Sequence, residues 1–502
     1  MPARPLSFWF RPALLAILVS SLSASPAEAK LLCFLQGLKA SIVKPVLEGP
    51  SDRATEQTFR RNFVRSIVKN NLIDNPSAQA HFSDDLMKSI NYDAAQNRKQ
   101  IIAKGRAKFD VVIVGNGVHG TIAALNLPPW LSVLVIDAGH RPGETFAKFR
   151  TSFPINSPEL ENTTANLFPN GAVQVKELST ERFVKPETLG NTILYNYYAS
   201  NVSSLLDVSL QAKNVSFIER ANGKIGSVIR LNLDGKPVEV QVNKQLLFST
   251  GLGVPEAKFT DANTLNLIAR EGRKPFSEKG IILFDDAMVE DGRLKNMQSS
   301  LHELYPDEEV AVVGSGDSAN GLVEELLRDG GPKRIHWVRQ KATTTEEFNK
   351  ANKARYHTTL GPRINDPKFV MNPNHCTEII EYPAVDGKKR FGLTTTSENG
   401  GQQTRMVNHV FITTGYENIL YKDLSGSGYE LVDVHGAVDG IGPDTVLSKR
   451  LTRNGKALPA QMIGPGGGKL ATEDEIKQTI TRNAVSINVT GPRTAAAAAL
   501  IH

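Results

Sequence analysis

The chain has 502 residues, of which 40% are hydrophobic and 22% charged, with a formal net charge of +6 and a pI near 9.0. That length is enough for two or three domains with separate cores, and the composition is typical of a globular protein. The positive charge forms no basic run interleaved with aromatic residues, which argues against a nucleic-acid-binding protein. We therefore expect a cationic surface that tolerates anionic cofactors.

The first 29 residues resemble a targeting segment. Arg4 and Arg11 precede an apolar run over residues 12–24, and Ala27-Glu-Ala29 supplies a small-x-small cleavage site. The run is too short to span a membrane comfortably, and no other stretch is long enough. We expect a signal peptide over 1–29 and an exported protein, periplasmic or secreted. The alternative is an uncleaved leader on a cytoplasmic protein.

A helical N-terminal extension is expected over residues 30–108, which are polar and contain pieces of helical periodicity. A buried parallel strand over 109–114 follows, and then a glycine turn, Gly115-Asn116-Gly117-Val118-His119-Gly120. A short helix over 121–127 ends at two prolines, and a second strand over 131–137 closes on Asp137.

This order predicts a dinucleotide-binding βαβ unit. Gly115 permits the tight turn, Gly117 admits the pyrophosphate, and Gly120 lets helix and strand pack closely. The helix N-terminus supplies backbone N–H groups for phosphate, and Asp137 is placed to bind a ribose hydroxyl. We interpret His119 as a cofactor-edge or surface residue rather than a base.

Short strands are expected over 215–219, 226–233, 238–242 and 245–251, with a hairpin turn at Asp234-Gly235. The last of these strands ends Ser-Thr-Gly251, and a later strand ends Thr-Thr-Gly415, so the pattern recurs. Residues 109–265 are therefore expected to form the first nucleotide-binding domain, together with 426–502, while 266–425 form a second domain.

The second domain carries its own turn, Gly314-Ser315-Gly316-Asp317-Ser318-Ala319, after a strand over 310–313. Alanine is a common small replacement for the third glycine. The next strand, 334–339, closes on Arg339, which suits an adenosine 2′-phosphate; the alternative is an exposed cation at a strand end.

The C-terminal part predicts a strand from Leu458 into a third glycine turn at Gly464, with a helix over 474–485. The two cysteines, Cys33 and Cys376, form no CxxC pair, which excludes a local redox dithiol and a cysteine-based zinc site. We identify no metal site. The histidines are scattered, so no catalytic side chain is assigned.

Two such units, each closed by a strand ending in Thr-Gly, resemble the two-dinucleotide-binding flavoprotein superfamily. Thr414-Gly415-Tyr416 and the turn at 314–319 are most similar to its flavin-containing and N-hydroxylating monooxygenase branch. Two features depart from that branch. Residues 280–286 lack its Phe-x-Gly-x-x-x-His motif, and Gly464-Pro465 replaces a terminal Gly-Asp.

The resemblance implies an α/β fold of two Rossmann-like three-layer domains, binding FAD and NAD(P), with β-meander insertions. It implies FAD in the first unit and NADPH in the second, with hydride transfer from the nicotinamide to the flavin. The reduced flavin would then pass electrons to oxygen or to an organic acceptor.

Three interpretations follow. The chain is an NADPH-dependent, monooxygenase-like enzyme acting on an unidentified small molecule, or an exported flavin oxidase or dehydrogenase with a vestigial second site. The third is a non-catalytic nucleotide-binding protein. Reduced nicotinamide is scarce outside the cytoplasm, so the expected leader and the expected NADPH site conflict with each other.

Overall fold

A computed structural model of the chain describes residues 50–72, 75–148, 168, 170–174, 185–220, 223–251, 253–288, 301–338, 344–351, 354–438, 442–464 and 491–498. The expected signal peptide, Arg339 and the helix expected over 474–485 lie outside these ranges. Every described element belongs to one unit, residues 49–502. None of the helices in the described ranges is long and apolar enough to cross a membrane.

In its described part, from residue 50 to residue 104, the N-terminal extension is helical, as the sequence predicts. It contains α3 (Pro50–Ile67), continued by a π-helical turn over Val68–Leu72, and the long α4 (Pro76–Lys104). The Asn75 side chain caps α4 by accepting from the backbone N–H of Ala78 at 3.0 Å, and Pro76 occupies the first turn. Gly105 ends α4 in the left-handed region, so the chain enters the first sheet directly.

The first sheet has nine strands, in the order β17-β18-β19-β6-β1-β2-β3, with β5 paired to β6 and β4 to β5. The central strands β19, β6, β1, β2 and β3 run parallel. The bounds are β1 (Arg106–Val114), β2 (Val133–Ile136), β3 (Ser203–Leu205), β4 (Val215–Glu219), β5 (Ile225–Leu233), β6 (Lys236–Phe248), β17 (Glu430–Val438), β18 (Gly442–Arg453) and β19 (Lys456–Ile463).

One strand differs from the sequence prediction. Residues 238–242 and 245–251 were expected to be separate strands, but β6 is a single strand of 13 residues. Its first half pairs antiparallel with β5, and its second half pairs parallel with β19. Both halves pair with β1, whose register shifts between Phe109 and Val111. Pairing along its whole length keeps the polar residues Asn243 and Lys244 inside one strand.

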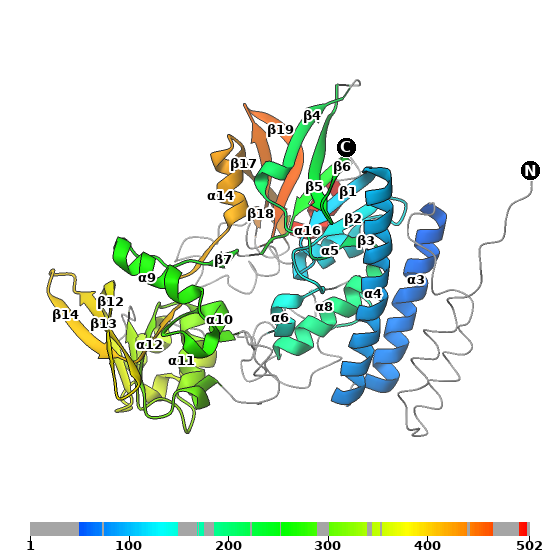
Figure 1. The fold of residues 1–502 in the computed structure, drawn as a ribbon. Helices are drawn as coiled ribbons and strands as arrows, with labels where there is room; N and C mark the ends of the chain where they lie inside the picture. Colours follow the sequence, from blue (N-terminus) through cyan, green and yellow to red (C-terminus); the bar gives the residue numbers. More distant parts are fainter. Residues whose placement is uncertain are drawn as a thin grey trace, which may run out of the picture. The chain divides into compact units, whose positions relative to one another are not determined.

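Helix α4 packs against β1, β3 and β6 of this sheet (Figure 1), and further helices pack against the sheet or against neighbouring helices. Their bounds are α5 (Val118–Asn126), α6 (Glu144–Lys148), α8 (Pro186–Ser200), α14 (Ile419–Gly426) and α16 (Gly491–Ala498). Helix α8 is buried along nearly all of its length, in contact with α3, α4, α5 and α6. Helix α16 packs against α5. The core of the sheet includes Val112, Leu134, Val240 and Phe248.

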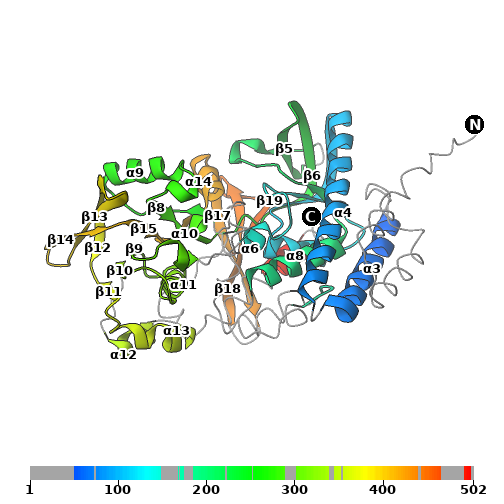
Figure 2. The same cartoon turned by 60° about the horizontal axis from the view of Figure 1, so that its bottom comes forward.

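The second sheet has five parallel strands in the order β11-β10-β9-β15-β8. The bounds are β8 (Ile281–Leu283), β9 (Glu309–Val313), β10 (Arg334–Val338), β11 (Phe369–Asn372) and β15 (His409–Ile412). Its helices are α9 (Ala262–Gly272), α10 (Phe284–Met288), α11 (Asp317–Leu326), α12 (Thr345–Ala351) and α13 (Ala354–Thr359). Helices α12 and α13 lie side by side (Figure 2).

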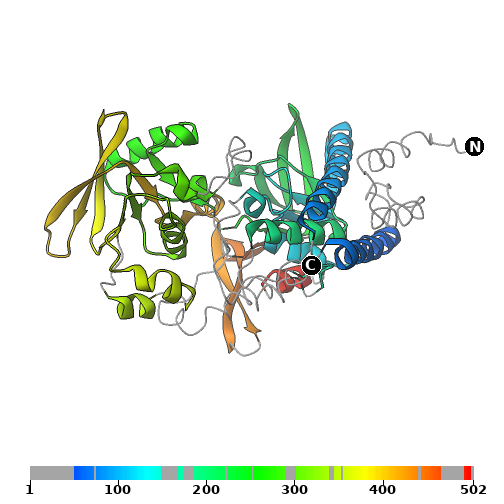
Figure 3. The ribbon, with the colours of Figure 1, turned by 90° about the horizontal axis from the view of Figure 1, so that it is seen from below.

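An antiparallel meander is inserted in the chain between β11 and β15. It consists of β12 (His375–Val385), β13 (Lys388–Thr396) and β14 (Gln402–Val407), which form a separate three-stranded sheet (Figure 3). The two chain segments that join the sheets also pair with each other, as β7 (Val254–Pro255) and β16 (Tyr416–Glu417). The expected α/β architecture with parallel sheets and a meander insertion is confirmed.

Candidate functional site

The first glycine turn connects β1 to α5. Gly115 has φ of +101°, and a Cβ there would overlap the backbone oxygen of Ser249. A Cβ at Gly120 would overlap the backbone oxygen of Gly115. A Cβ at Gly117, by contrast, would meet nothing within 4 Å. Gly115 and Gly120 are therefore required by packing, whereas Gly117 leaves the backbone open at the N-terminus of α5.

Asp137 closes the turn from the end of β2. Its carboxylate accepts the backbone N–H of Asn116 at 2.6 Å and that of Gly139 at 2.6 Å. Burial raises the pKa of Asp137 from its ordinary value to about 6, against the lowering effect of these two hydrogen bonds. The sequence predicted a ribose ligand, and the structure adds a second role. Asp137 shapes the turn by accepting two backbone N–H groups. Because a carboxylate has further acceptor positions, it could still accept a hydrogen bond from a ribose hydroxyl.

The residues of this turn fit a dinucleotide. Asn116 is 2% exposed, and its buried Nδ2 has no hydrogen-bond partner among the described residues. The buried hydroxyl of Ser249 likewise has no hydrogen-bond partner among the described residues. Unpaired buried polar groups are costly unless a ligand or water satisfies them. Together with the open backbone at Gly117 and the helix N-terminus, they form a cradle suited to a pyrophosphate.

The C-terminal glycine turn begins beside the first one. Gly464, at the end of β19, has φ of +76°, and a Cβ there would stand 2.6 Å from Cγ of His119. Val118 is buried in the core under the turn. The imidazole of His119 thus packs against Gly464, which is consistent with an edge position. Residues 465–490 lie outside the described ranges.

The second turn, between β9 and α11, repeats the hydrogen bonds of the first. The N–H of Gly115 donates to Ile136 at 2.8 Å, and that of Gly314 donates to Val338 at 3.1 Å. Likewise, Ser249 N–H donates to Val114 at 2.7 Å, and Thr413 N–H to Val313 at 2.8 Å. The repeat noted in the sequence is therefore a structural repeat.

The second turn resembles the first in two further respects: its first glycine lies close to a neighbouring strand end, and its second glycine has free space around it. A Cβ at Gly314, whose φ is +138°, would overlap the Thr413 side chain and backbone, whereas one at Gly316 would meet nothing within 4 Å. Ser315 and Gly316 are exposed and Ser318 is half-buried. Asp317 begins α11. The exposed backbone at this helix N-terminus again suits a phosphate.

The remaining predicted residues lie on the segments between the sheets. Gly251 accepts a hydrogen bond from Asn418 Nδ2 at 3.2 Å, and Gly415 accepts one from the backbone N–H of Glu256 at 2.9 Å. These two glycines belong to the connecting segments, two residues after Ser249 and Thr413, which lie against the first glycine of each turn. Arg339 directly follows β10, outside the described ranges.

Four residues near the turns were not predicted. Ser249 and Thr413 contact the first glycine of each turn, and the repeated Ser/Thr-Thr-Gly motif was the signal for both. Trp337 donates its indole N–H to the Gly314 oxygen at 2.7 Å. Asp285 accepts the Tyr416 hydroxyl at 2.7 Å, an approach that only the folded chain reveals.

Comparison with known proteins gives the fold. No protein-family model and no curated protein matches the sequence. Among solved structures, the bacillithiol disulfide reductase of Staphylococcus aureus aligns with a TM-score of 0.50 at 14% identity, over 79% of this chain and 99% of that one. The Bacillus cereus bacillithiol disulfide reductase gives 0.48 at 16% identity, over 77% and 99%. Ornithine hydroxylase from Pseudomonas aeruginosa gives 0.45 at 13%, over 79% and 100%.

The alignment with the Staphylococcus aureus structure, together with the two repeated turns, shows the fold. The chain has the fold of the two-dinucleotide-binding flavoproteins, as the sequence predicted. Within the described ranges, no group of three or more His, Cys, Asp or Glu residues is arranged to hold a metal ion.

Proposed function

We propose that this protein is an FAD-dependent oxidoreductase that uses NADPH and acts on a small molecule. The observation that carries the proposal is the structural repeat of two dinucleotide turns, in which Ser249 and Thr413 play equivalent parts against Gly115 and Gly314. Two open helix N-termini in one chain suit two dinucleotides. A protein that bound a single nucleotide would leave one of these two helix N-termini without a ligand.

The first turn is the proposed flavin site. Backbone N–H groups at Gly117 and the N-terminus of α5 would hold the pyrophosphate, Asn116 Nδ2 and the Ser249 hydroxyl would lose their unpaired state, and Asp137 would accept a ribose hydroxyl. The second turn would hold the nicotinamide dinucleotide, with Arg339 on the 2′-phosphate. Bound FAD would supply a two-electron acceptor, whose reduced form would pass the electrons to oxygen or to an organic compound.

A monooxygenase-like reaction is the specific form that we propose. It is supported by the resemblance of Thr414-Gly415-Tyr416 and of residues 314–319 to the N-hydroxylating branch. Disulfide reduction, the activity named for the Staphylococcus aureus protein, is less suited to this chain. Its two cysteines are far apart in sequence, and burial raises the pKa of Cys376 to about 12, which disfavours the reactive thiolate.

The test is spectroscopic. Purified protein should show flavin absorbance, and NADPH should bleach it in anaerobic buffer before any substrate is added. Flavin absorbance that NADPH leaves unchanged, while an organic substrate bleaches it, would instead favour the oxidase or dehydrogenase with a vestigial second site. Colourless protein that binds no added FAD would contradict the proposal.

We also propose that the protein is exported, on the strength of the leader over residues 1–29. The mature chain would then begin at Lys30. Intact-mass measurement of protein from the native cell distinguishes this from an uncleaved cytoplasmic form.

A further inference from the structure

The strand order of the second sheet indicates over which strands each half of a bound dinucleotide would lie. From β9 the chain moves to β10 and β11 on one side and, after the meander, to β15 on the other, where β8 pairs. Ligands of open parallel sheets bind outside the carboxyl ends of the strands where the order reverses. The adenosine half of a bound dinucleotide would lie over the β9–β10 side, next to the expected position of Arg339, and the nicotinamide half over β15 and β8.

On that β15–β8 side the structure brings together three polar side chains from separate segments. The Tyr416 hydroxyl, just after β15, donates to Asp285 Oδ1 at 2.7 Å. Asp285 follows the carboxyl end of β8, in α10. The Ser318 side chain, in the first turn of α11, lies near enough to the Tyr416 phenol to lower its pKa. The pair therefore lies beside the second glycine turn.

The chemistry of this pair suits a ligand rather than packing alone. Asp285 and Tyr416 are both half-buried, so solvent still reaches them. The Tyr416 phenol is a hydrogen-bond donor at neutral pH, and burial and the neighbouring carboxylate raise its pKa further. Its hydrogen bond holds Asp285 in one orientation. A carboxylate has more acceptor positions than a single phenol fills. The adjacent Asp286, in contrast, pairs with Lys279 at 2.6 Å.

We propose that Asp285, oriented by Tyr416, is a positioning residue that binds the nicotinamide riboside half of the second dinucleotide. Its carboxylate would accept from the donors of that half, which are the ribose hydroxyls and the carboxamide N–H2. This inference rests on the proposed function. It adds that the two halves of one ligand are held by different parts of the sheet.

The test compares two probes that differ in the nicotinamide riboside half. NADP⁺ contains both halves, whereas 2′,5′-ADP contains only the adenosine half. Dissociation constants for both are measured by calorimetry on the full chain, for wild type, Asp285→Asn and Tyr416→Phe, with Asp286→Asn as the matched control. NAD⁺ against 5′-ADP gives the same comparison if the chain prefers the unphosphorylated coenzyme.

We expect Asp285→Asn to raise the dissociation constant of NADP⁺ about tenfold, the effect of losing one hydrogen bond to a charged group, and to leave 2′,5′-ADP unchanged. Tyr416→Phe should give a smaller change of the same kind, and Asp286→Asn none. Equal weakening of both probes, or no weakening of NADP⁺, would overturn the inference. Wild type that binds neither coenzyme, even at millimolar concentration, would refute the proposed function itself.

Discussion

The carboxylate of Asp137 accepts the backbone N–H of Asn116 across 2.6 Å, so the acid at the end of β2 holds the glycine turn that follows β1. The other carboxylate oxygen accepts the N–H of Gly139. A residue expected to bind only a ligand therefore also fixes the loop around it. Substitution of Asp137 should affect both ligand affinity and the pH dependence of folding.

Asp137→Asn should change how stability depends on pH. Because burial raises the pKa of Asp137 to about 6, the folded chain binds a proton more tightly than the unfolded chain. In wild type this group therefore stabilises the fold below pH 4 and loses that contribution as pH rises through 6. The stability of wild type relative to Asp137→Asn should rise by at most about 3 kcal/mol between pH 7 and pH 4. Thermal melts of the flavin-free proteins measure it, and parallel pH profiles would contradict it.

Gly115→Ala should abolish flavin binding and destabilise the chain by roughly 3 kcal/mol or more, because the new Cβ would overlap the backbone oxygen of Ser249. Gly235→Ala is the matched control. Gly235 also has a positive φ, +79°, but a Cβ there meets nothing within 4 Å. The control should lose only about 1 kcal/mol from backbone strain and keep its flavin. Equal losses in the two variants would show that contact with Ser249 is unimportant.

Gly464→Ala should weaken flavin binding through a clash with His119, since the added Cβ would lie 2.6 Å from Cγ of the imidazole. Removing the ring in the double variant Gly464→Ala/His119→Ala should restore part of the lost stability, leaving the strain of φ +76°. A double-mutant cycle by chemical denaturation measures this coupling. Additive losses would mean that the ring moves aside.

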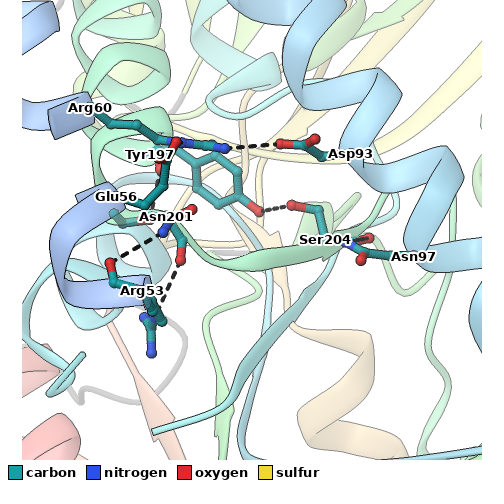
Figure 4. Close-up of polar contacts among 9 residues, drawn as sticks. Arg53, Glu56, Arg60, Asp93, Asn97, Tyr197, Asn201 and Ser204 are labelled. Carbon is teal, nitrogen blue, oxygen red and sulfur yellow. Dashed lines mark hydrogen bonds and ion pairs between the residues drawn. The ribbon is translucent and has the colours of Figure 1, made fainter. Parts of the chain in front are cut away.

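Arg53 should be essential for the stability of the first domain. Arg53 is 6% exposed, and its guanidinium donates to the backbone oxygen of Asn201 at 3.0 Å (Figure 4). It also donates to the backbone oxygen of Leu131. Burial lowers the pKa of Arg53 only to about 10, so it stays charged at neutral pH. We expect Arg53→Met to cost about 2–4 kcal/mol by leaving carbonyl groups unpaired, a fall in Tm of roughly 5–10 °C. Lys99→Met, at an exposed position on α4, should leave Tm unchanged.

Arg339→Ala should weaken NADPH more than NADH, by about tenfold, because only NADPH carries the 2′-phosphate that the guanidinium would pair with. Dissociation constants for the two coenzymes measure the difference. Equal losses would place Arg339 outside the coenzyme site and favour its interpretation as an exposed cation at a strand end.

The local features of both nucleotide units could be predicted from the sequence, because they depend on short-range steric rules. A tight turn needs Gly115, and close packing of helix on strand needs Gly120. Buried parallel strands appear as apolar runs, as in β1 and β9. The repeated Thr-Gly strand ends also marked the residues that meet the turns.

What the sequence could not reveal depends on contacts between distant segments. Strand β6 is continuous because β1 pairs along both halves, a fact about partners rather than about residues 236–248 themselves. Arg60 is 5% exposed, yet it is paired with Glu56 and Asp93 of the same extension (Figure 4). It also lies over the ring of Tyr198 in α8, a contact outside the extension that the sequence of the extension does not reveal.

By itself, then, the sequence determined that the chain carries two dinucleotide turns, because each turn is specified by a few neighbouring residues and their allowed backbone angles. Only the tertiary structure decided that Asp137 holds the first turn, that Gly464 meets His119, and that Asp285 and Tyr416 lie beside the second. Those relationships join residues 21 to 345 positions apart, and only the pairing of strands brings such residues within hydrogen-bonding or van der Waals distance.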